Sequence, residues 1–308
     1  MQGIVIKSTG SWYTVLCNDK IIECRIKGLF RIKGIKTTNP IAVGDVVDFE
    51  MEADGRGVIH AIGERKNYII RKSINLSKQS HILASNIDQA IVLATLAFPR
   101  TSPGFIDRFL LTAEAYHIPV IIIFNKADLF EGAAAMKGLD DFMAIYERIG
   151  YKCYKVSAIK DTDVDLLRNI TKDKTTLIAG HSGVGKSTLV NAMDNSLDLK
   201  VGEISDAHSK GKHTTTFAEM HRLVYGGFII DTPGIKELGI VDMEKEEIGN
   251  YFREMYAIKD QCKFNNCIHV NEPKCAVIEA VQRGEIAVTR YTSYASIVSG
   301  EELDTTNY

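Results

Sequence analysis

Short runs in which apolar and polar residues alternate fill residues 1–70, and Gly, Asn and Asp turns separate them. A period of two residues is typical of strands that bury one face. No long helical repeat interrupts these runs, so the segment predicts a small all-β barrel of the OB-fold type. The predicted strands are Gly3–Ser8, Trp12–Cys17, Lys20–Ile26, Val46–Met51 and Gly57–Ile62.

From about Ser73 onward, continuous apolar runs alternate with amphipathic segments. This alternation predicts a mostly parallel sheet that helices cover on both faces. Asp161 or Thr162 is expected to cap one helix. The predicted strands are Ile87–Leu96, Val120–Phe124, Tyr151–Val156, Thr175–Ala179 and Phe228–Ile230. The predicted helices are Phe105–His117, Leu139–Ile149, a helix ending at Ile170, and Ser187–Met193.

The last part of the chain has a helical period again, and Tyr291 and Tyr294 share one helix face, where we expect them to pack. The helices predicted there are Glu244–Ala257, Ala276–Arg283 and Ile286–Val298. A chain of 308 residues is long enough for two or three independent cores. The predicted domains are the barrel at 1–70, the parallel-sheet domain at 73–241 and a helical domain at 242–308.

Composition excludes few functions. The hydrophobic fraction is 45% and the formal net charge is -2, both ordinary for a globular protein. No apolar run approaches the ~20 residues of a membrane span, and the N-terminus lacks a secretory pattern. We therefore expect a cytoplasmic protein with no membrane partner, and we expect a monomer.

Basic residues are concentrated in the barrel segment, where Lys20–Lys36 holds six basic residues and one acid, Glu23. This stripe could face the phosphates of a nucleic acid, or it could be a solvated strand face, and the segment alone favours neither. Trp12, Tyr13 and Phe30 could stack on bases, because OB-folds commonly bind nucleic acid on one sheet face. Each of these aromatics also suits the core, which we favour.

The segment Gly180–Ser187 matches the phosphate-binding pattern GxxxxGK[ST] at every fixed position. Glycines let several backbone N–H groups point at one phosphate chain, and the following helix N-terminus favours negative charge. Lys186 supplies a charge for the β- and γ-phosphates and so contributes to catalysis, and the Ser187 hydroxyl can ligate Mg²⁺. A chance Gly-rich turn is the alternative. The expected phosphate-binding residues are Gly180, His181, Ser182, Gly183, Val184, Gly185, Lys186, Ser187 and Thr188.

The segment Asn125–Asp128 follows a buried strand and indicates which base is bound. The Asp128 carboxylate can accept both the N1–H and the 2-amino hydrogens of guanine, which adenine does not offer. A site that depends on such hydrogen bonds rejects the wrong ligand by roughly 10⁴-fold. Asn125 can brace the phosphate loop, and the Lys126 stem can cover the ring. A simple turn after the strand is the alternative.

Two further segments complete a guanosine triphosphate site. Ser157–Ala158 follows a strand and can give a backbone N–H to the guanine O6. Asp231–Gly234 follows another strand, where Asp231 would hold Mg²⁺ through water and the Gly234 N–H would sense the γ-phosphate. The residues expected at the base are Asn125, Lys126, Ala127, Asp128, Ser157 and Ala158. In ordinary GTPases the phosphate loop comes first, so this chain order is circularly permuted.

Three cysteines and one histidine lie close together in the helical region: Cys262, Cys267, His269 and Cys275. Three thiolates and one imidazole form the closed ligand set of a structural zinc site, with no open position for catalysis. Loop cysteines without a metal are the alternative. Disulfides are not expected in a reducing cytosol. The remaining cysteines, Cys17, Cys24 and Cys153, are expected to be ordinary buried thiols.

The chain resembles the circularly permuted, ribosome-small-subunit-dependent GTPase A family of bacteria over essentially its whole length. The resemblance rests on the nucleotide segments, on Gly211–Thr216 and on the cysteine–histidine cluster. It implies an N-terminal OB-fold, a central permuted GTPase domain and a C-terminal zinc domain. It also implies that the protein binds the 30S subunit and its 16S rRNA, acts late in subunit maturation and hydrolyses GTP to GDP faster when docked.

Catalysis needs a group that orients the attacking water. Ras-like GTPases use a glutamine directly after the Asp231–Gly234 type of turn, but this chain has Ile235 there. His213 is the best internal candidate, because an imidazole can accept a proton near neutral pH, and the resemblance favours it over a surface histidine. Among the threonines that follow, Thr215 is expected to meet Mg²⁺ and the γ-phosphate. Residues 198–216 are expected to form the first switch loop.

Three functions compete at this stage. The first is an enzyme whose GTP hydrolysis is triggered on the 30S subunit. The second is a GTP-gated scaffold for RNA or protein, in which hydrolysis is incidental. The third, an ATPase, is disfavoured by Asp128. We favour the first, and stimulation of turnover by purified 30S subunits separates it from the second.

Overall fold

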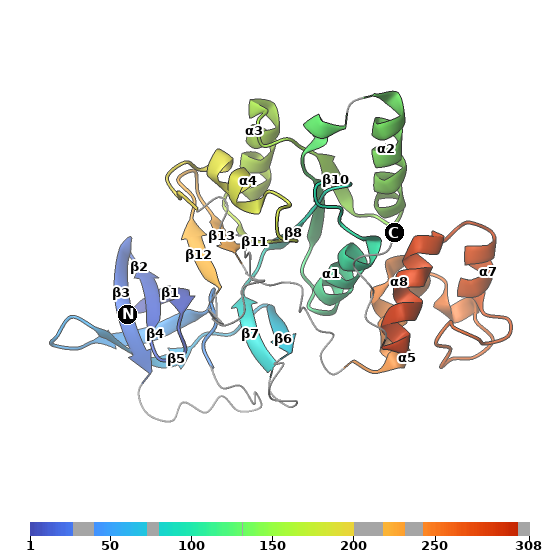
Figure 1. Cartoon of the computed structure of the whole chain (residues 1–308). Coiled ribbons are helices and arrows are strands. Elements are labelled where there is room, and N and C mark those ends of the chain that lie inside the picture. Colours follow the sequence, from blue (N-terminus) through green and yellow to red (C-terminus); the bar gives the residue numbers. More distant parts are fainter. Residues whose placement is uncertain (27–39, 73–79, 131, 200–217, 232–242, 301–308) are drawn as a thin grey trace, which may run out of the picture.

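The computed structural model describes residues 1–26, 40–72, 80–130, 132–199, 218–231 and 243–300. Figure 1 shows a strand-rich N-terminal part, a central sheet with helices and a helical C-terminal part side by side. None of the helices in these described ranges is both long and apolar enough to cross a bilayer.

The N-terminal strands close into a barrel. Neighbouring strands pair in the order β1-β2-β3-β5-β4, and β4 pairs back to β1, so no strand of the ring is left unpaired. Val5, Tyr13 and Phe49 fill the interior with no exposed surface. The predicted all-β barrel is confirmed. The strands are β1 (Gln2–Ser8), β2 (Tyr13–Cys17), β3 (Lys20–Ile26), β4 (Val46–Met51) and β5 (Gly57–Ile62).

Two aromatic predictions in the barrel have different outcomes. Tyr13 lies in the core as expected, but Trp12 is 39% exposed, with the Arg56 guanidinium 5.2 Å from its ring centroid. The core expectation for Trp12 is therefore wrong, because the residue directly precedes β2 and escapes the alternation of that strand. Phe30 lies outside the described residues, as do four residues of the basic stripe: Lys27, Arg31, Lys33 and Lys36.

The central sheet has the strand order β10-β9-β8-β11-β13-β12 and is parallel except for β12. The edge strand β12 also pairs with β1 of the barrel at Glu219 and Lys7, so both sheets join into one. The predicted permuted parallel-sheet domain is confirmed. The strands are β8 (Gln89–Ala94), β9 (Val120–Phe124), β10 (Lys152–Lys155), β11 (Thr175–Gly180), β12 (Glu219–Arg222) and β13 (Phe228–Asp231).

Helices cover both faces of this sheet, as the pattern predicts. Alternate side chains of β8 explain why: Ala90 and Val92 pack with α1 and α2, whereas Ile91 and Leu93 pack with α3 and α4. The N-cap of α3 is Lys160 rather than Asp161 or Thr162, so the predicted cap is wrong. The helices are α1 (Pro103–Ala115), α2 (Ala133–Arg148), α3 (Asp161–Thr171) and α4 (Lys186–Met193).

The sequence pattern did not predict one hairpin and the 3-10 turns of the described chain. A hairpin of β6 (Tyr68–Lys72) and β7 (Ser80–Ser85) follows the barrel, and a 3-10 turn (Ala127–Leu129) follows β9. The single helix predicted over Glu244–Ala257 is wrong, because a 3-10 turn at Gly249–Tyr251 divides it. Its parts are α5 (Lys245–Ile248) and α6 (Arg253–Tyr256), and a further 3-10 turn (Lys259–Gln261), α7 (Ala276–Gln282) and α8 (Val288–Ser299) follow.

The helical part has its own core but is fastened to the central domain. Phe252, Met255 and Tyr294 are fully buried there, and Leu111 of α1 completes the cluster. Figure 1 shows α8 beside α1. Arg290 of α8 is 2% exposed and donates to Asp107 of α1 over 2.7 Å, so a buried ion pair joins the two parts.

Candidate nucleotide and metal sites

The carboxyl ends of four parallel strands bring the predicted nucleotide segments to one edge of the sheet. Asn125 follows β9, Ser157 follows β10, Gly180 ends β11 and Asp231 ends β13. Ligands of open parallel sheets bind outside these carboxyl ends, between the loops. The permuted chain order therefore does not prevent the segments from meeting.

The phosphate loop has a backbone that only glycine allows at its end. Gly185 has φ +96°, and a Cβ there would lie 2.5 Å from Asn125 Nδ2. A Cβ on Gly180 would lie 2.9 Å from the Leu93 carbonyl oxygen. The helix α4 begins directly afterwards at Lys186, so its N-terminus faces the loop. This cradle fits a polyphosphate chain.

The side chains of the loop divide between the core and the site. Val184 is fully buried beneath the loop, and Thr188 is exposed. His181 stacks on Phe105 of α1 with ring centroids 3.8 Å apart, a contact that sequence patterns did not predict. Ser182 is half-buried. None of these four side chains carries a permanent positive charge, so the backbone N–H groups of the loop remain the predicted phosphate ligands.

Lys186 and Asp231 form the charged floor beside the loop. Lys186 Nζ donates to the Gly180 carbonyl over 2.7 Å and to the His181 carbonyl over 3.2 Å. Burial lowers the pKa of Lys186, and Asp231 opposes that shift. Burial raises the pKa of Asp231, and Lys186 opposes it in turn. A phosphate at Lys186 and a divalent cation at Asp231 would each restore the charged form, and Ser187 lies in the first turn of α4 to complete such a cation site.

The turn after β9 is tied to the phosphate loop by two side chains. Asn125 is 3% exposed, and its Nδ2 donates to the Val184 carbonyl over 2.9 Å. Lys126 Nζ donates to the Gly183 carbonyl over 2.8 Å and to the Phe98 carbonyl. Asn125 Oδ1 is buried and has no partner within the described part of the chain. The base-binding turn and the phosphate loop therefore form one unit.

Asp128 meets the turn after β10. The Ser157 hydroxyl is buried and donates to Asp128 Oδ1 over 2.5 Å, which fixes the carboxylate beside Ala158. Ala127 starts the 3-10 turn and donates its N–H to the Val156 carbonyl over 3.1 Å. The sequence places Ser157 at the base, but the structure adds that its side chain orients Asp128.

Several predicted residues lie outside the described ranges. These are His213 and Thr215, the rest of Gly211–Thr216, and Gly234 with Ile235. The catalytic assignment of His213 and the Mg²⁺ assignment of Thr215 therefore stay predictions.

The four predicted metal ligands come together in the helical part. Their ligand atoms all lie within 4.8 Å of one another. Cys262 Sγ is 3.9 Å from Cys275 Sγ and 3.5 Å from His269 Nδ1. Zn–S bonds of ~2.3 Å and Zn–N bonds of ~2.0 Å in a tetrahedron give S···S of about 3.8 Å and S···N of about 3.5 Å. The cluster that also contains Cys267 is therefore compatible with zinc.

The pKa shifts of the ligands and the hydrogen bonds that hold the ligand turn also suit a metal. Burial, with smaller contributions from the neighbouring cysteines, raises the pKa of Cys267 to about 12, so the thiolate needs a cation beside it. Burial lowers the pKa of His269, which keeps the imidazole neutral. Glu272 accepts backbone N–H groups of Ile268, Val270 and Asn271, and Tyr291 and Tyr294 donate to the carbonyls of His269 and Ile268.

These two tyrosines pack, as predicted, but they also hold the ligand turn, which helical spacing alone could not indicate. The outcome for the other cysteines is mixed: Cys17 and Cys24 are buried, whereas Cys153 is half-buried.

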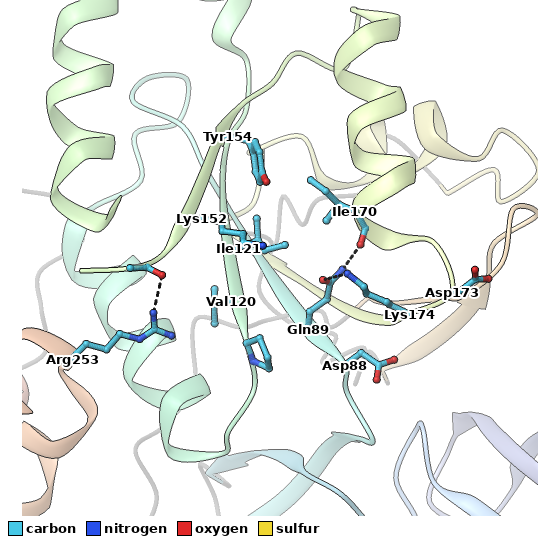
Figure 2. A pocket seen from close by; sticks show the side chains of 12 residues that line it. Asp88, Gln89, Val120, Ile121, Lys152, Tyr154, Ile170, Asp173, Lys174 and Arg253 are labelled. Atoms are coloured by element: carbon cyan, nitrogen blue, oxygen red, sulfur yellow. Dashed lines mark hydrogen bonds between the residues drawn. The ribbon is translucent and has the colours of Figure 1, made fainter. Parts of the chain in front are cut away.

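A cavity of ≈ 560 Å³ lies at the opposite, amino edge of the sheet (Figure 2). Its floor is Gln89, whose Nε2 donates to the Ile170 carbonyl over 2.9 Å and whose Oε1 accepts from Lys174 over 3.1 Å. On the far side Arg253 donates to the Gly150 carbonyl over 3.0 Å. The polar groups named here are already paired, and no described residue of the nucleotide segments lines this cavity.

Comparison with known proteins agrees with this geometry. The family model for the RsgA GTPase matches residues 62–241, and the model for the RsgA N-terminal domain matches residues 2–59. The chain is 56% identical over 307 residues to the Small ribosomal subunit biogenesis GTPase RsgA of Flavobacterium psychrophilum, covering 98% of this chain and 94% of that protein. It is 52% identical to the protein of the same name from Bacteroides fragilis, covering 98% and 97%.

Solved structures agree as well. YjeQ from Thermotoga maritima matches with a TM-score of 0.78 at 34% identity, covering 97% of both chains. YloQ, described as a circularly permuted GTPase, matches with a TM-score of 0.74 at 32% identity, covering 100% of this chain and 96% of that one. The resemblance inferred from the motifs is confirmed, and the chain belongs to the RsgA GTPase family.

Proposed function

We propose that this GTPase binds the small (30S) ribosomal subunit, assists its late maturation and hydrolyses GTP on docking. One observation carries the GTP-binding part of the proposal: the guanine turn and the phosphate loop are bonded into one unit through Asn125 and Lys126. Relatives that are 52–56% identical over nearly their whole length carry the name Small ribosomal subunit biogenesis GTPase. This supports the partner as well as the reaction.

The nucleotide site acts mainly by position and charge. Asp128 accepts the N1–H and 2-amino hydrogens of guanine, and the backbone of Gly180–Ser187 surrounds the phosphates. Lys186 neutralises charge on the β- and γ-phosphates. Mg²⁺ supplies further charge neutralisation when bound, and the residues that would hold it are Ser187, Thr215 and, through water, Asp231. Gly234 follows Asp231 closely and would contact the γ-phosphate.

His213 is the proposed general base for hydrolysis. Its imidazole would accept a proton from the attacking water, a role that the apolar side chain of Ile235 cannot take. The family's dependence on a partner fits a base that lies on a separate segment from the phosphate loop. Lys186 and Thr215 assist by stabilising charge on the phosphates.

The proposed metal of Cys262, Cys267, His269 and Cys275 is one structural Zn²⁺. The closed set of four ligands supports folding rather than catalysis, and metal binding in such loops contributes on the order of 10 kcal/mol. The domain limits proposed are 1–70, 73–241 and 242–308. Each holds most of one hydrophobic core of the described residues, but Val43 and Ile69 join the central core and Leu111 joins the helical core.

The proposed contacts with 16S rRNA are the barrel and the zinc domain. Within the basic stripe, Lys20 is exposed, but Arg25 is paired with Glu52 over 2.8 Å, so the described part of the stripe offers less free charge than the sequence indicates. A monomeric, cytoplasmic protein with GTP, GDP and the 30S subunit as partners is consistent with this assignment.

The test is GTP turnover by the full chain with purified 30S or 50S subunits at physiological salt. We expect 30S subunits to raise turnover at least 10-fold, as is common when a partner completes a GTPase site, and 50S subunits to have no effect. A rate that neither particle changes would contradict docking-triggered hydrolysis. Nucleotide-dependent co-sedimentation without stimulation would instead support the GTP-gated scaffold.

A further inference from the structure

We infer that Asp163 positions the guanine-recognition turn and thereby determines the choice of base. The inference rests on the proposed guanine site. Asp163 lies in the first turn of α3, and its Oδ2 accepts the backbone N–H of Ser157 over 2.8 Å. The nucleotide patterns in the sequence do not include this residue.

Two carboxylates hold Ser157, one at its backbone N–H and one at its side-chain hydroxyl. Its N–H is bound by Asp163, and its hydroxyl donates to Asp128 Oδ1 over 2.5 Å. Ser157 is only 1% exposed, so its N–H and hydroxyl depend on these two partners rather than on bulk water. The orientation of Asp128, which reads the N1–H and 2-amino edge of guanine, therefore depends on a turn that Asp163 anchors.

The same bond determines which backbone N–H is left for the base. The turn closes with the N–H of Lys160 on the Ser157 carbonyl over 3.1 Å, and the Ser157 N–H is occupied by Asp163. The N–H groups of Ala158 and Ile159 have no partner among the described residues, but Ala158 is half-buried beside the site, whereas Ile159 is 78% exposed. Ala158 is therefore the donor for the guanine O6, and it is aimed by the bond between Ser157 and Asp163.

The neighbouring acid provides a matched comparison. Asp161 lies in the same first turn of α3 and is exposed, but the Ser157 N–H bonds to Asp163 and not to Asp161. Both carboxylates contribute the same charge near the helix N-terminus, so a general electrostatic effect on the helix would be shared by both. An effect of Asp163 alone would come from its hydrogen bond.

The experiment measures the affinities of GDP, IDP and ADP for the full chain by isothermal titration. Asp163→Ala leaves the Ser157 N–H buried without a partner, so we expect GDP binding to weaken about 10- to 100-fold. The preference for GDP over ADP is expected to fall by a similar factor. Asp163→Asn retains an acceptor oxygen and is expected to stay within ~3-fold of wild type. Asp161→Ala is expected to match wild type.

Kinetics separate positioning from loss of folding. Asp163→Ala should raise KM for GTP while kcat at saturating GTP stays near wild type, because the phosphates are not involved. A variant that merely unfolds loses GDP and ADP binding together and loses kcat. The inference is overturned if Asp163→Ala keeps the wild-type ratio of GDP to ADP affinity, or if it behaves like Asp161→Ala. If the wild-type chain itself does not prefer GDP to ADP, the proposed guanine site fails instead.

Discussion

Substitution of Arg290 tests how the helical part is fastened to the GTPase domain. Its guanidinium is 2% exposed and donates to Asp107 Oδ1 over 2.7 Å and to Glu254 Oε1 over 2.7 Å. The ring centroid of Phe252 lies 4.5 Å from the Arg290 Cζ. Arg290→Ala therefore leaves two buried carboxylates without their cation. Removing one partner of a buried pair costs about 3–5 kcal/mol.

The loss should be local to α1 and α8, where the pair is made. Hydrogen exchange followed by mass spectrometry measures the opening of these helices directly. A loss of 3–5 kcal/mol corresponds to roughly 2 × 10²- to 5 × 10³-fold faster exchange if opening follows stability. The chain contains one tryptophan, Trp12 in the barrel, so its fluorescence reports whether the barrel stays folded.

Two further variants make this prediction decisive. Arg283→Ala removes an exposed arginine that pairs with Glu285 over 2.8 Å, and it is expected to leave exchange in α1 and α8 unchanged. The triple variant Asp107→Asn, Glu254→Gln, Arg290→Met removes every charge of the network and is expected to recover most of the protection. If Arg290→Ala exchanges no faster than Arg283→Ala, the buried pair does not fasten the two parts.

Three other predictions concern the sites. Gly185→Ala places a Cβ 2.5 Å from Asn125 Nδ2 at φ +96°, so GDP affinity measured by titration should fall at least ~10-fold, whereas Gly138→Ala, with open space around its Cβ, should bind normally. Cys267→Ser should lower bound zinc from one per chain to none by mass spectrometry of the metal, and full occupancy in that variant would contradict the ligand assignment. His213→Ala should lower 30S-stimulated turnover by about 10²- to 10⁴-fold with little change in GTP affinity, and unchanged stimulated turnover would exclude it as the base.

Much of the central sheet was predictable because buried parallel strands are continuous apolar runs. Val120–Phe124 is fully buried along its length, and its predicted bounds agree with β9. The edge strand β12, with the sequence Glu-Met-His-Arg, was not predicted, because it is polar and too short to show a period. Its pairing with β13 and with the barrel, rather than its own sequence, makes it a strand. The helix predicted over Glu244–Ala257 failed because its period continues past the break at Gly249.

In the site, too, some residues were predictable from the sequence and others were not. Residues that contact the ligand form short local patterns, since each loop must present several groups to one nucleotide. The residues that hold those loops form no local pattern, because their partners are distant in the chain. The Phe98 carbonyl accepts from Lys126, and Phe105 stacks on His181. Such contacts depend on how α1 and its preceding loop pack. Only a structure shows them.

The barrel and the helical part contact the GTPase domain in different ways. The barrel covers the edge strand β12, where Lys7 pairs with Glu219 over 3.3 Å, and an uncovered edge strand would be a template for association with other chains. The helical part packs on α1, away from that edge (Figure 1). The Lys7–Glu219 pair is more than two-fifths exposed and so contributes little energy, whereas the Arg290 network is buried. The helical part is therefore held to the GTPase domain by a specific buried contact. The barrel adds a buried contact of its own to the strand pairing, because Asp45 binds Arg65 over 2.6 Å and accepts from Ser85 over 2.6 Å.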